Sequence, residues 1–180
     1  QGRDVKFYQD WVRHSSYDDY WRKISNLDSY PRIGAPVLHM GGWFDAYTAG
    51  ALINFNGMIQ QGKTSEARRG QKIIIGPWKH DLSESTRLGQ LDFGPQSLVD
   101  LMALELRWFD HWLKGIENAV ADEPPVNVFV MGANRWRQAD DWPIPGTRYT
   151  SYYLHSGGKA NSLFGDGGLD TTAPTSETPD

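Results

Sequence analysis

The sequence has 180 residues, enough for one domain or two small ones, and its 39% hydrophobic and 13% aromatic content is that of a folded protein and not of a disordered tail. Its 22 acidic and 18 basic residues leave a net charge of −4, which argues against a nucleic acid or an anionic membrane surface as the main partner. The absence of cysteine excludes disulfides, thiolate nucleophiles and cysteine-ligated zinc, and it leaves the cellular compartment open, with the cytoplasm favoured. No apolar run reaches the roughly 20 residues of a membrane span.

The N-terminal part of the chain is predicted to contain short helices. Aromatic residues recur from Phe7 to Ile24 among charged side chains, a pattern that suits one or two helices with one buried face. Ser16, which precedes Asp18 and Asp19, is expected to begin one of these helices.

Two buried strands with a helix between them are predicted next. Residues 37–40 form an apolar run that ends in a glycine pair, and residues 46–61 place apolar side chains near helical spacing. Residues 73–75 are three isoleucines without polar alternation, which is typical of a parallel sheet covered on both faces. This order predicts a βαβ unit with a right-handed crossover.

A longer helix is predicted after a polar loop. Apolar residues continue at a spacing of 3.6 from Leu98 to Leu113, with Gly94 expected as the N-cap and Pro95 as the first helical residue. Gly115 is expected to end the helix.

The pattern changes after Glu117. Residues 122–125 resemble a linker, and in residues 126–131 three valines alternate with Asn127, Phe129 and Met131. Residues 149–154 form a second alternating run, and both runs are typical of antiparallel strands of a sandwich. Residues 157–180 are rich in Gly, Thr, Ser, Asp and Pro and complete no second core. The predicted class is therefore α/β, with a parallel sheet and flanking helices followed by the start of a β-sandwich.

Two acid–base residues follow the predicted parallel strands. Asp45 comes shortly after the first strand and His80 shortly after the second, so both should lie at the carboxyl edge of the sheet, where α/β proteins bind ligands. A carboxylate bonded to an imidazole leaves the other ring nitrogen free to accept a proton from a nucleophile. The order Asp then His also fits an α/β-hydrolase triad. Asp45 could equally be an ordinary helix N-cap, and His80 an ordinary loop histidine.

A nucleophile is missing from the pattern. No G-x-S-x-G is present, and Ser15, Ser16 and Ser156 do not lie on a strand-to-helix turn with flanking glycines. Since the sequence opens at Gln1 and not at a methionine, we expect the serine to come from a segment that precedes it.

The other titratable residues suggest structural roles. His39 lies in a predicted buried strand and is expected to be a satisfied core histidine, whereas His111 should lie on the wetter side of the long helix. No partner is predicted for His14 or His155. A solvated surface cluster is expected at Arg68, Arg69 and Lys72. No metal-ligand spacing and no phosphate-loop motif occur, so neither metal nor cofactor is expected.

Several stretches together resemble one protein family. They are PVLHMGGWFD at 36–45, IGPWKH at 75–80 and LRWFDHWLKG at 106–115. On these motifs the sequence resembles the α/β-hydrolases that include X-Pro dipeptidyl-peptidases, cocaine esterase and the glutaryl acylases. PPVNVFVMGANRWRQADDWP at 124–143 and YYLHSGGKANSL at 152–163 resemble the entry into the C-terminal jelly-roll domain of that family.

The resemblance implies a serine acyl hydrolase of esters, amides or X-Pro peptide bonds. Asp45 and His80 would be two members of its Ser-Asp-His triad, and the partners would be a small ester, amide or short peptide and the N-terminal part of the same hydrolase. The resemblance divides the chain into the end of a helical cap (1–30), the C-terminal part of the hydrolase domain (31–118), and a linker with the start of the sandwich (119–180). The aromatic residues that flank the two loops are candidates for substrate binding: Trp43, Phe44, Tyr47 and Trp78.

Two alternatives belong to other functional classes. The first is a non-catalytic module whose β-sandwich binds a carbohydrate or peptide, with the α/β part as scaffold. The second is a nucleotide-binding α/β protein, which would need a phosphate loop upstream. A G-x-S-x-G motif upstream would favour the enzyme over both. We also expect the isolated chain to be inactive and to associate through an unpaired strand edge.

Overall fold

The computed structural model describes residues 5–82 and 84–175. Its internal contacts divide the chain into two units, Gln1–Pro145 and Gly146–Asp180. The first unit contains α1 (Lys6–Arg13), α2 (Asp19–Arg22), a 3-10 helix (Tyr30–Arg32), β1 (Val37–Gly42), α3 (Thr48–Gln61), α4 (Ser65–Arg69), β2 (Gln71–Gly76), β3 (Arg87–Leu88), β4 (Leu91–Asp92), a second 3-10 helix (Pro95–Ser97), α5 (Leu101–Lys114), β5 (Val126–Val130) and β6 (Arg135–Ala139). The second unit contains β7 (Tyr153–His155) and β8 (Gly168–Asp170).

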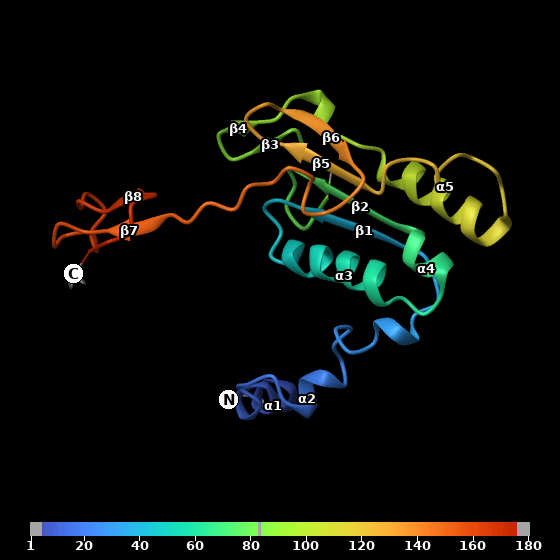
Figure 1. The fold of residues 1–180 in the computed structure, drawn as a ribbon, viewed down its shortest axis with the longest axis horizontal. Helices are drawn as coiled ribbons and strands as arrows, with labels where there is room; N and C mark the ends of the chain where they lie inside the picture. Colours follow the sequence, from blue (N-terminus) through green and yellow to red (C-terminus); the bar gives the residue numbers. More distant parts are fainter. Residues whose placement is uncertain (1–4, 83, 176–180) are drawn as a thin grey trace. The chain divides into compact units, whose positions relative to one another are not determined.

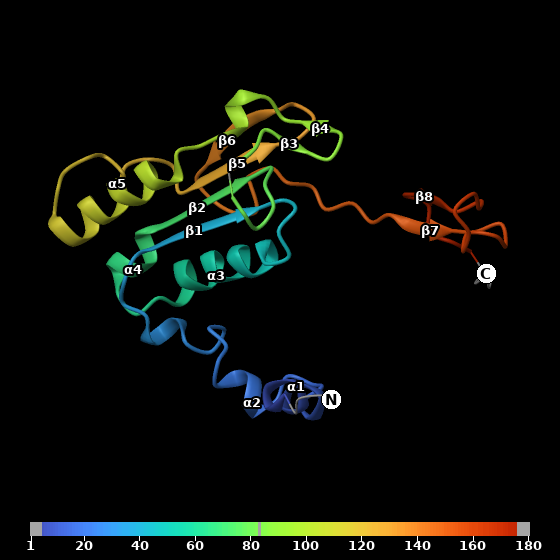
Figure 2. The same cartoon turned by 180° about the vertical axis from the view of Figure 1, so that it is seen from behind.

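The predicted βαβ unit is present. Strands β1 and β2 pair in parallel from Val37↔Gln71 to Gly42↔Gly76, and α3 connects them through α4. Helix α3 covers one face of the sheet, and α5 lies on the other side of β1 and β2 (Figures 1 and 2). Two clusters of buried side chains make the core under α3. The larger one lies between α3 and the sheet and contains Phe55, Ile73, Ile75, Val126 and Val128, and the smaller one contains Tyr30, Met58 and Ala67. Burial on both faces explains why the isoleucine run of β2 shows no polar alternation.

Strand β5 corrects the expected start of the sandwich. The sequence placed residues 126–131 in a separate β-sandwich, but β5 pairs in parallel with β2, from Ile73↔Val126 to Ile75↔Val128. The sheet therefore has the order β1-β2-β5-β6. Val126 and Val128 of β5 are buried and Asn127 is partly buried, but Phe129 on the face of Asn127 is buried as well, so the sequence pattern indicates a buried strand without identifying its partner.

Strand β6 was not predicted. It pairs antiparallel with β5, from Val126↔Ala139 to Val130↔Arg135, and so gives a mostly parallel sheet an antiparallel border strand. Its residues Arg135 and Arg137 are exposed. Charged side chains of this kind are common on border strands, where they discourage pairing with other chains. They also interrupt the apolar pattern by which a strand is predicted from sequence.

The boundaries of three helices differ from the prediction at their N-termini. Helix α5 begins at Leu101, because the carboxylate of Asp100 accepts the N–H of Ala103, whereas Gly94 and Pro95 open the separate 3-10 helix. Helix α2 is capped by Asp18 and not by Ser16, and α3 begins at Thr48. The C-terminus of α5 is as predicted, with Gly115 in the left-handed conformation at φ 70°.

The second unit contains a small antiparallel sheet. Strands β7 and β8 pair from Tyr153↔Asp170 to His155↔Gly168. Strand β7 begins later than the alternating run 149–154 suggested, and β8 was not predicted. The expected jelly roll stays a prediction. Within the described ranges, no helix is both long and apolar enough to cross a membrane.

Candidate active site

Asp45 and His80 meet at the carboxyl edge of the sheet, as predicted. Strands β1 and β2 end side by side at Gly42↔Gly76, and Nδ1 of His80 lies 3.1 Å from Oδ2 of Asp45. The two side chains differ in exposure. That of Asp45 is only 6% exposed, whereas the imidazole is 74% exposed. The carboxylate is therefore fixed within the protein, and the ring faces outward.

Backbone hydrogen bonds hold the two loops together. The N–H of Trp43 donates to Gly76 O at 2.9 Å, and the N–H of Phe44 donates to Trp78 O at 3.0 Å. These bonds continue the β1–β2 pairing past the strand ends. They require close approach, because a Cβ on Gly42 would overlap the carbonyl group of Trp78. The glycine that ends β1 thus permits the contact between the loops.

The environment of Asp45 keeps its carboxylate ionised. The backbone N–H of Tyr47 donates to Oδ1 at 2.9 Å and is the largest cause of a lowered pKa of Asp45, followed by the hydrogen bond with His80. An ionised carboxylate can only accept, so the proton of the 3.1 Å bond belongs to Nδ1 of His80. The outward-facing Nε2 is then unprotonated in the neutral ring and can accept a proton.

The four aromatic candidates fall into two groups. Trp78 is 3% exposed and its indole N–H donates to Ser97 O at 2.9 Å, while half-buried Trp43 donates to Phe129 O at 2.7 Å. Phe44 and Tyr47 are exposed, at 41% and 69%. The ring of Tyr47 packs edge-to-face against the imidazole of His80, with 5.2 Å between centroids. Only this second pair presents free aromatic surface at the site.

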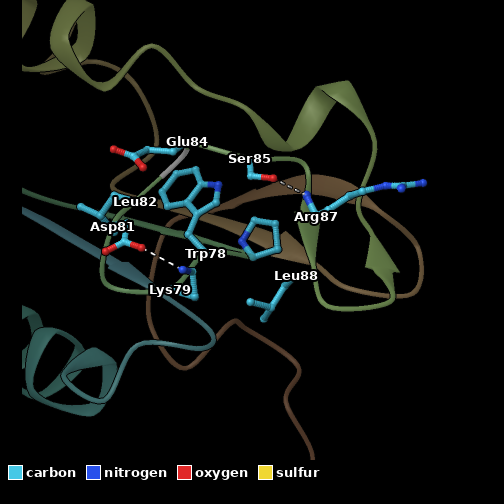
Figure 3. A pocket seen from close by; sticks show the side chains of 9 residues that line it. Trp78, Lys79, Asp81, Leu82, Glu84, Ser85, Arg87 and Leu88 are labelled. Atoms are coloured by element: carbon cyan, nitrogen blue, oxygen red, sulfur yellow. Dashed lines mark hydrogen bonds and ion pairs between the residues drawn. The ribbon is translucent and has the colours of Figure 1, made fainter.

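A pocket lies beside the loop that carries His80 (Figure 3). Figure 3 shows an ion pair between Lys79 Nζ and Asp81 Oδ2, 2.8 Å long, near the ring of Trp78. The remaining lining comes from the segment between His80 and β4: Leu82, Glu84, Ser85, Arg87 and Leu88, with Pro77. The sequence reasoning missed this pocket, because a polar loop carries no periodic signal of a concave surface.

The other histidines have structural partners. His39 is buried and bonds through Nε2 to Oε1 of Gln71 at 2.8 Å, as expected of a core histidine. Burial lowers the pKa of His39, and the bond to Gln71 offsets this in part. His14 and His155, for which no partner was predicted, bond to Asp18 Oδ2 at 2.6 Å and to Thr172 O at 3.0 Å.

Lys72 contradicts the predicted solvated cluster. Its Nζ is buried and donates to Val120 O at 3.0 Å and to Glu123 Oε2 at 2.7 Å, while Arg107 bonds to the other oxygen of Glu123. Burial raises the pKa of Glu123, but the bonds from Lys72 and Arg107 outweigh it, and the net pKa is lowered. This network joins β2, α5 and the segment before β5.

In the parts of the chain that the structure describes, no group of three or more acidic or histidine side chains is arranged to hold a metal ion.

Two family models match the chain. Residues 1–81 match the X-Pro dipeptidyl-peptidase (S15 family), and residues 118–180 match the X-Pro dipeptidyl-peptidase C-terminal non-catalytic domain. The first range contains both Asp45 and His80. Together the two ranges agree with the resemblance derived from the sequence motifs.

Known proteins similar to the chain are several times longer. It is 31% identical to cocaine esterase from Rhodococcus sp. (strain MB1 Bresler), over 94% of this chain and 29% of that protein. A crystal structure of an aminopeptidase from the marine sediment archaeon Thaumarchaeota archaeon superposes with a TM-score of 0.73 at 23% identity, over 97% of this chain and 27% of its own. A CocE/NonD family hydrolase from Staphylococcus aureus gives 0.56 at 20% identity, over 84% and 24%. These structures show a shared fold, of which the chain spans less than a third.

Proposed function

Because the chain belongs to the X-Pro dipeptidyl-peptidase and cocaine esterase family, we propose that it supplies the acid and the base of a Ser-Asp-His triad in a serine hydrolase of esters or amides. The contact between Asp45 and His80 is the observation that carries this proposal. The nucleophilic serine would come from polypeptide outside this sequence, since no G-x-S-x-G occurs within it.

The geometry supports a standard acyl transfer. Nε2 of His80 would take the proton of the serine hydroxyl while its oxygen attacks the substrate carbonyl carbon. The imidazolium formed would be stabilised by the ionised carboxylate of Asp45. It would then give the proton to the leaving alcohol or amine as the bond to the carbonyl carbon breaks. Water would hydrolyse the acyl-enzyme by the same proton transfers in the second half of the cycle.

We propose Phe44 and Tyr47 as substrate contacts. Both rings are exposed at the edge that carries the triad residues, and Tyr47 touches the imidazole itself. The indole N–H groups of Trp43 and Trp78 donate hydrogen bonds to backbone carbonyls of the protein. We therefore assign these two residues to the support of the loops and not to contact with substrate. We take the substrate class from the family match and propose a small ester, an amide or a short X-Pro peptide. The division into a cap (1–30) and a hydrolase part from residue 31 onward is likewise a proposal, with β5 and β6 included in the sheet of the hydrolase part.

The test uses the complete protein that contains this chain and its nucleophile. A fluorophosphonate should label one serine, and Asp45→Asn should lower kcat by about 10⁴-fold, because the amide favours the wrong tautomer of His80. Asp81→Asn is the matched control, since Asp81 is the residue directly after His80 and pairs with Lys79 instead. We expect the control to retain kcat. A loss below tenfold in Asp45→Asn, or the absence of a labelled serine, would exclude the triad.

A further inference from the structure

Each of the two loops of the site is anchored to the β5–β6 hairpin by a tryptophan. Trp43, two residues before Asp45, donates its indole N–H to Phe129 O in β5 at 2.7 Å. Trp78, two residues before His80, packs against Trp136 in β6 with 5.7 Å between ring centroids. The two anchors are thus placed alike on the two loops.

The anchor on the His80 loop is part of a larger clamp. The indole N–H of Trp78 donates to Ser97 O at 2.9 Å, and that of Trp136 donates to the neighbouring carbonyl, Gln96 O, at 2.7 Å. Trp136 also packs edge-to-face on Phe129, with 5.3 Å between ring centroids. Both indoles therefore bind the same 3-10 helix, and the hairpin holds them against it.

The clamp connects directly to the loop that carries Asp45. The carbonyl of Trp78 accepts the N–H of Phe44, the residue next to Asp45. A displacement of Trp78 would therefore move both loops. The imidazole of His80 is 74% exposed and is held by the hydrogen bond to Asp45 and by the ring of Tyr47, so its position depends on how firmly its loop is held.

We propose that the β5–β6 hairpin positions the Asp45–His80 pair, with Trp136 as a positioning residue that acts through Trp78. This inference rests on the proposed function. It assigns a part in catalysis to a hairpin within residues 118–180, the range that matches a domain described as non-catalytic. The reason is topological, since β5 is a strand of the same sheet as β1 and β2.

The first experiment is steady-state kinetics of the complete hydrolase with a p-nitrophenyl ester. We expect Trp136→Ala to lower kcat by about 10- to 100-fold with little change in KM, because a displaced base slows the chemical step. Trp136→Phe keeps an aromatic ring against Trp78 and should therefore retain most of the kcat of the parent. Arg137→Ala, an exposed neighbour on the same strand, is the control and should retain kcat.

The second experiment measures position without activity. The Nδ1 proton of His80, bonded to Asp45, should give a resolved low-field proton NMR signal in the parent and in Trp136→Phe, and the signal should be lost in Trp136→Ala. If Trp136→Ala does not fold, Trp43→Phe replaces it. That variant keeps an aromatic ring at the position but removes the indole N–H bonded to Phe129 O, and it should weaken the same signal and lower kcat.

The outcomes separate the two proposals. If His80→Ala leaves hydrolysis unchanged, the proposed function fails, and the NMR signal still tests the positioning role. If His80→Ala abolishes hydrolysis but the folded Trp136 and Trp43 variants retain both kcat and the Nδ1 signal, the positioning role is wrong.

Discussion

At the end of β1, Gly42 lies against the backbone of the loop that follows β2. A Cβ at this position would overlap the carbonyl carbon and oxygen of Trp78, which are backbone atoms and cannot rotate away. The requirement is for space and not for an unusual conformation, since the backbone of Gly42 is that of a strand. The close approach is what allows Phe44 to bond to Trp78.

We therefore expect Gly42→Ala to destabilise the protein by about 1–3 kcal/mol, as overpacking in a well-packed region does. Gly50→Ala is the control. Gly50 lies inside α3 with nothing within 4 Å of a new Cβ, so its replacement should stabilise by about 0.5–1 kcal/mol. Chemical denaturation of both variants measures the difference. Equal stability of Gly42→Ala and the parent would contradict the packing argument.

The carboxylate of Asp45 makes stability depend on pH in a defined window. Its pKa in the folded protein is lowered from 3.8 by the Tyr47 N–H and by His80, so the unfolded chain binds its proton first as the pH falls. The stabilisation by these contacts should be complete above pH 3.8 and should be lost as the pH falls through the lower folded pKa. Thermal unfolding of the parent and Asp45→Asn from neutral pH to about pH 2 should show their difference shrinking in that window. A difference independent of pH would show that the ionised form has no special role.

At the scale of elements, the network of Lys72, Glu123 and Arg107 joins three segments that are distant in sequence. Lys72 is on β2, Arg107 is on α5, and Glu123 precedes β5. The ammonium group of Lys72 is nearly out of reach of water, with its side chain 9% exposed. Removing its charged partner would leave a buried charge with only the carbonyl of Val120.

Glu123→Gln is expected to cost about 1.5–3 kcal/mol, the range for hydrogen bonds to charged groups. Glu117→Gln, at an exposed position in the same connection, should cost little. Urea denaturation of the two variants gives the comparison. If both lose the same small amount, the network contributes no more than a surface ion pair does.

For the whole molecule, the two borders of the main sheet differ. Strand β6 presents charged arginines at one border, whereas β1 at the other is a parallel strand that pairs only with β2 within the described residues. One face of α5 is also apolar and exposed, with large side chains at helical spacing: Met102, Leu106, Phe109 and Leu113. In parallel sheets, strands such as β1 are normally paired on both sides, and apolar helix faces such as that of α5 are normally covered. We therefore expect both surfaces to promote association with other molecules.

The isolated 180-residue chain should therefore be inactive as an esterase and should self-associate. Sedimentation velocity over a range of concentrations should show growth in mass, and hydrogen exchange should show that the amides of β1 become protected as it grows. A monomer at every concentration, with esterase activity of its own, would overturn both this expectation and the need for an outside serine.

Local sequence patterns anticipated much of this structure. The isoleucines of β2 and the glycine that ends α5 act through short-range physics, namely burial of a strand on two faces and the freedom of glycine at positive φ. The meeting of Asp45 and His80 was also predictable, because parallel neighbours end at one edge of a sheet and both residues follow a strand end.

Other features were decided only by the tertiary structure. The valines of β5 indicate a buried strand but do not identify the sheet that the strand joins, and pairing with β2 places the hairpin beside the site. The burial of Lys72 depends on a carboxylate 51 residues away, and the support of the loops by Trp43 and Trp78 depends on carbonyl groups 86 and 19 residues away. The periodicity of a sequence indicates which side of a helix or strand is buried. The strand that pairs with it, the carboxylate that pairs with a lysine and the carbonyl that accepts from an indole depend on contacts between distant segments, and no local pattern predicts these.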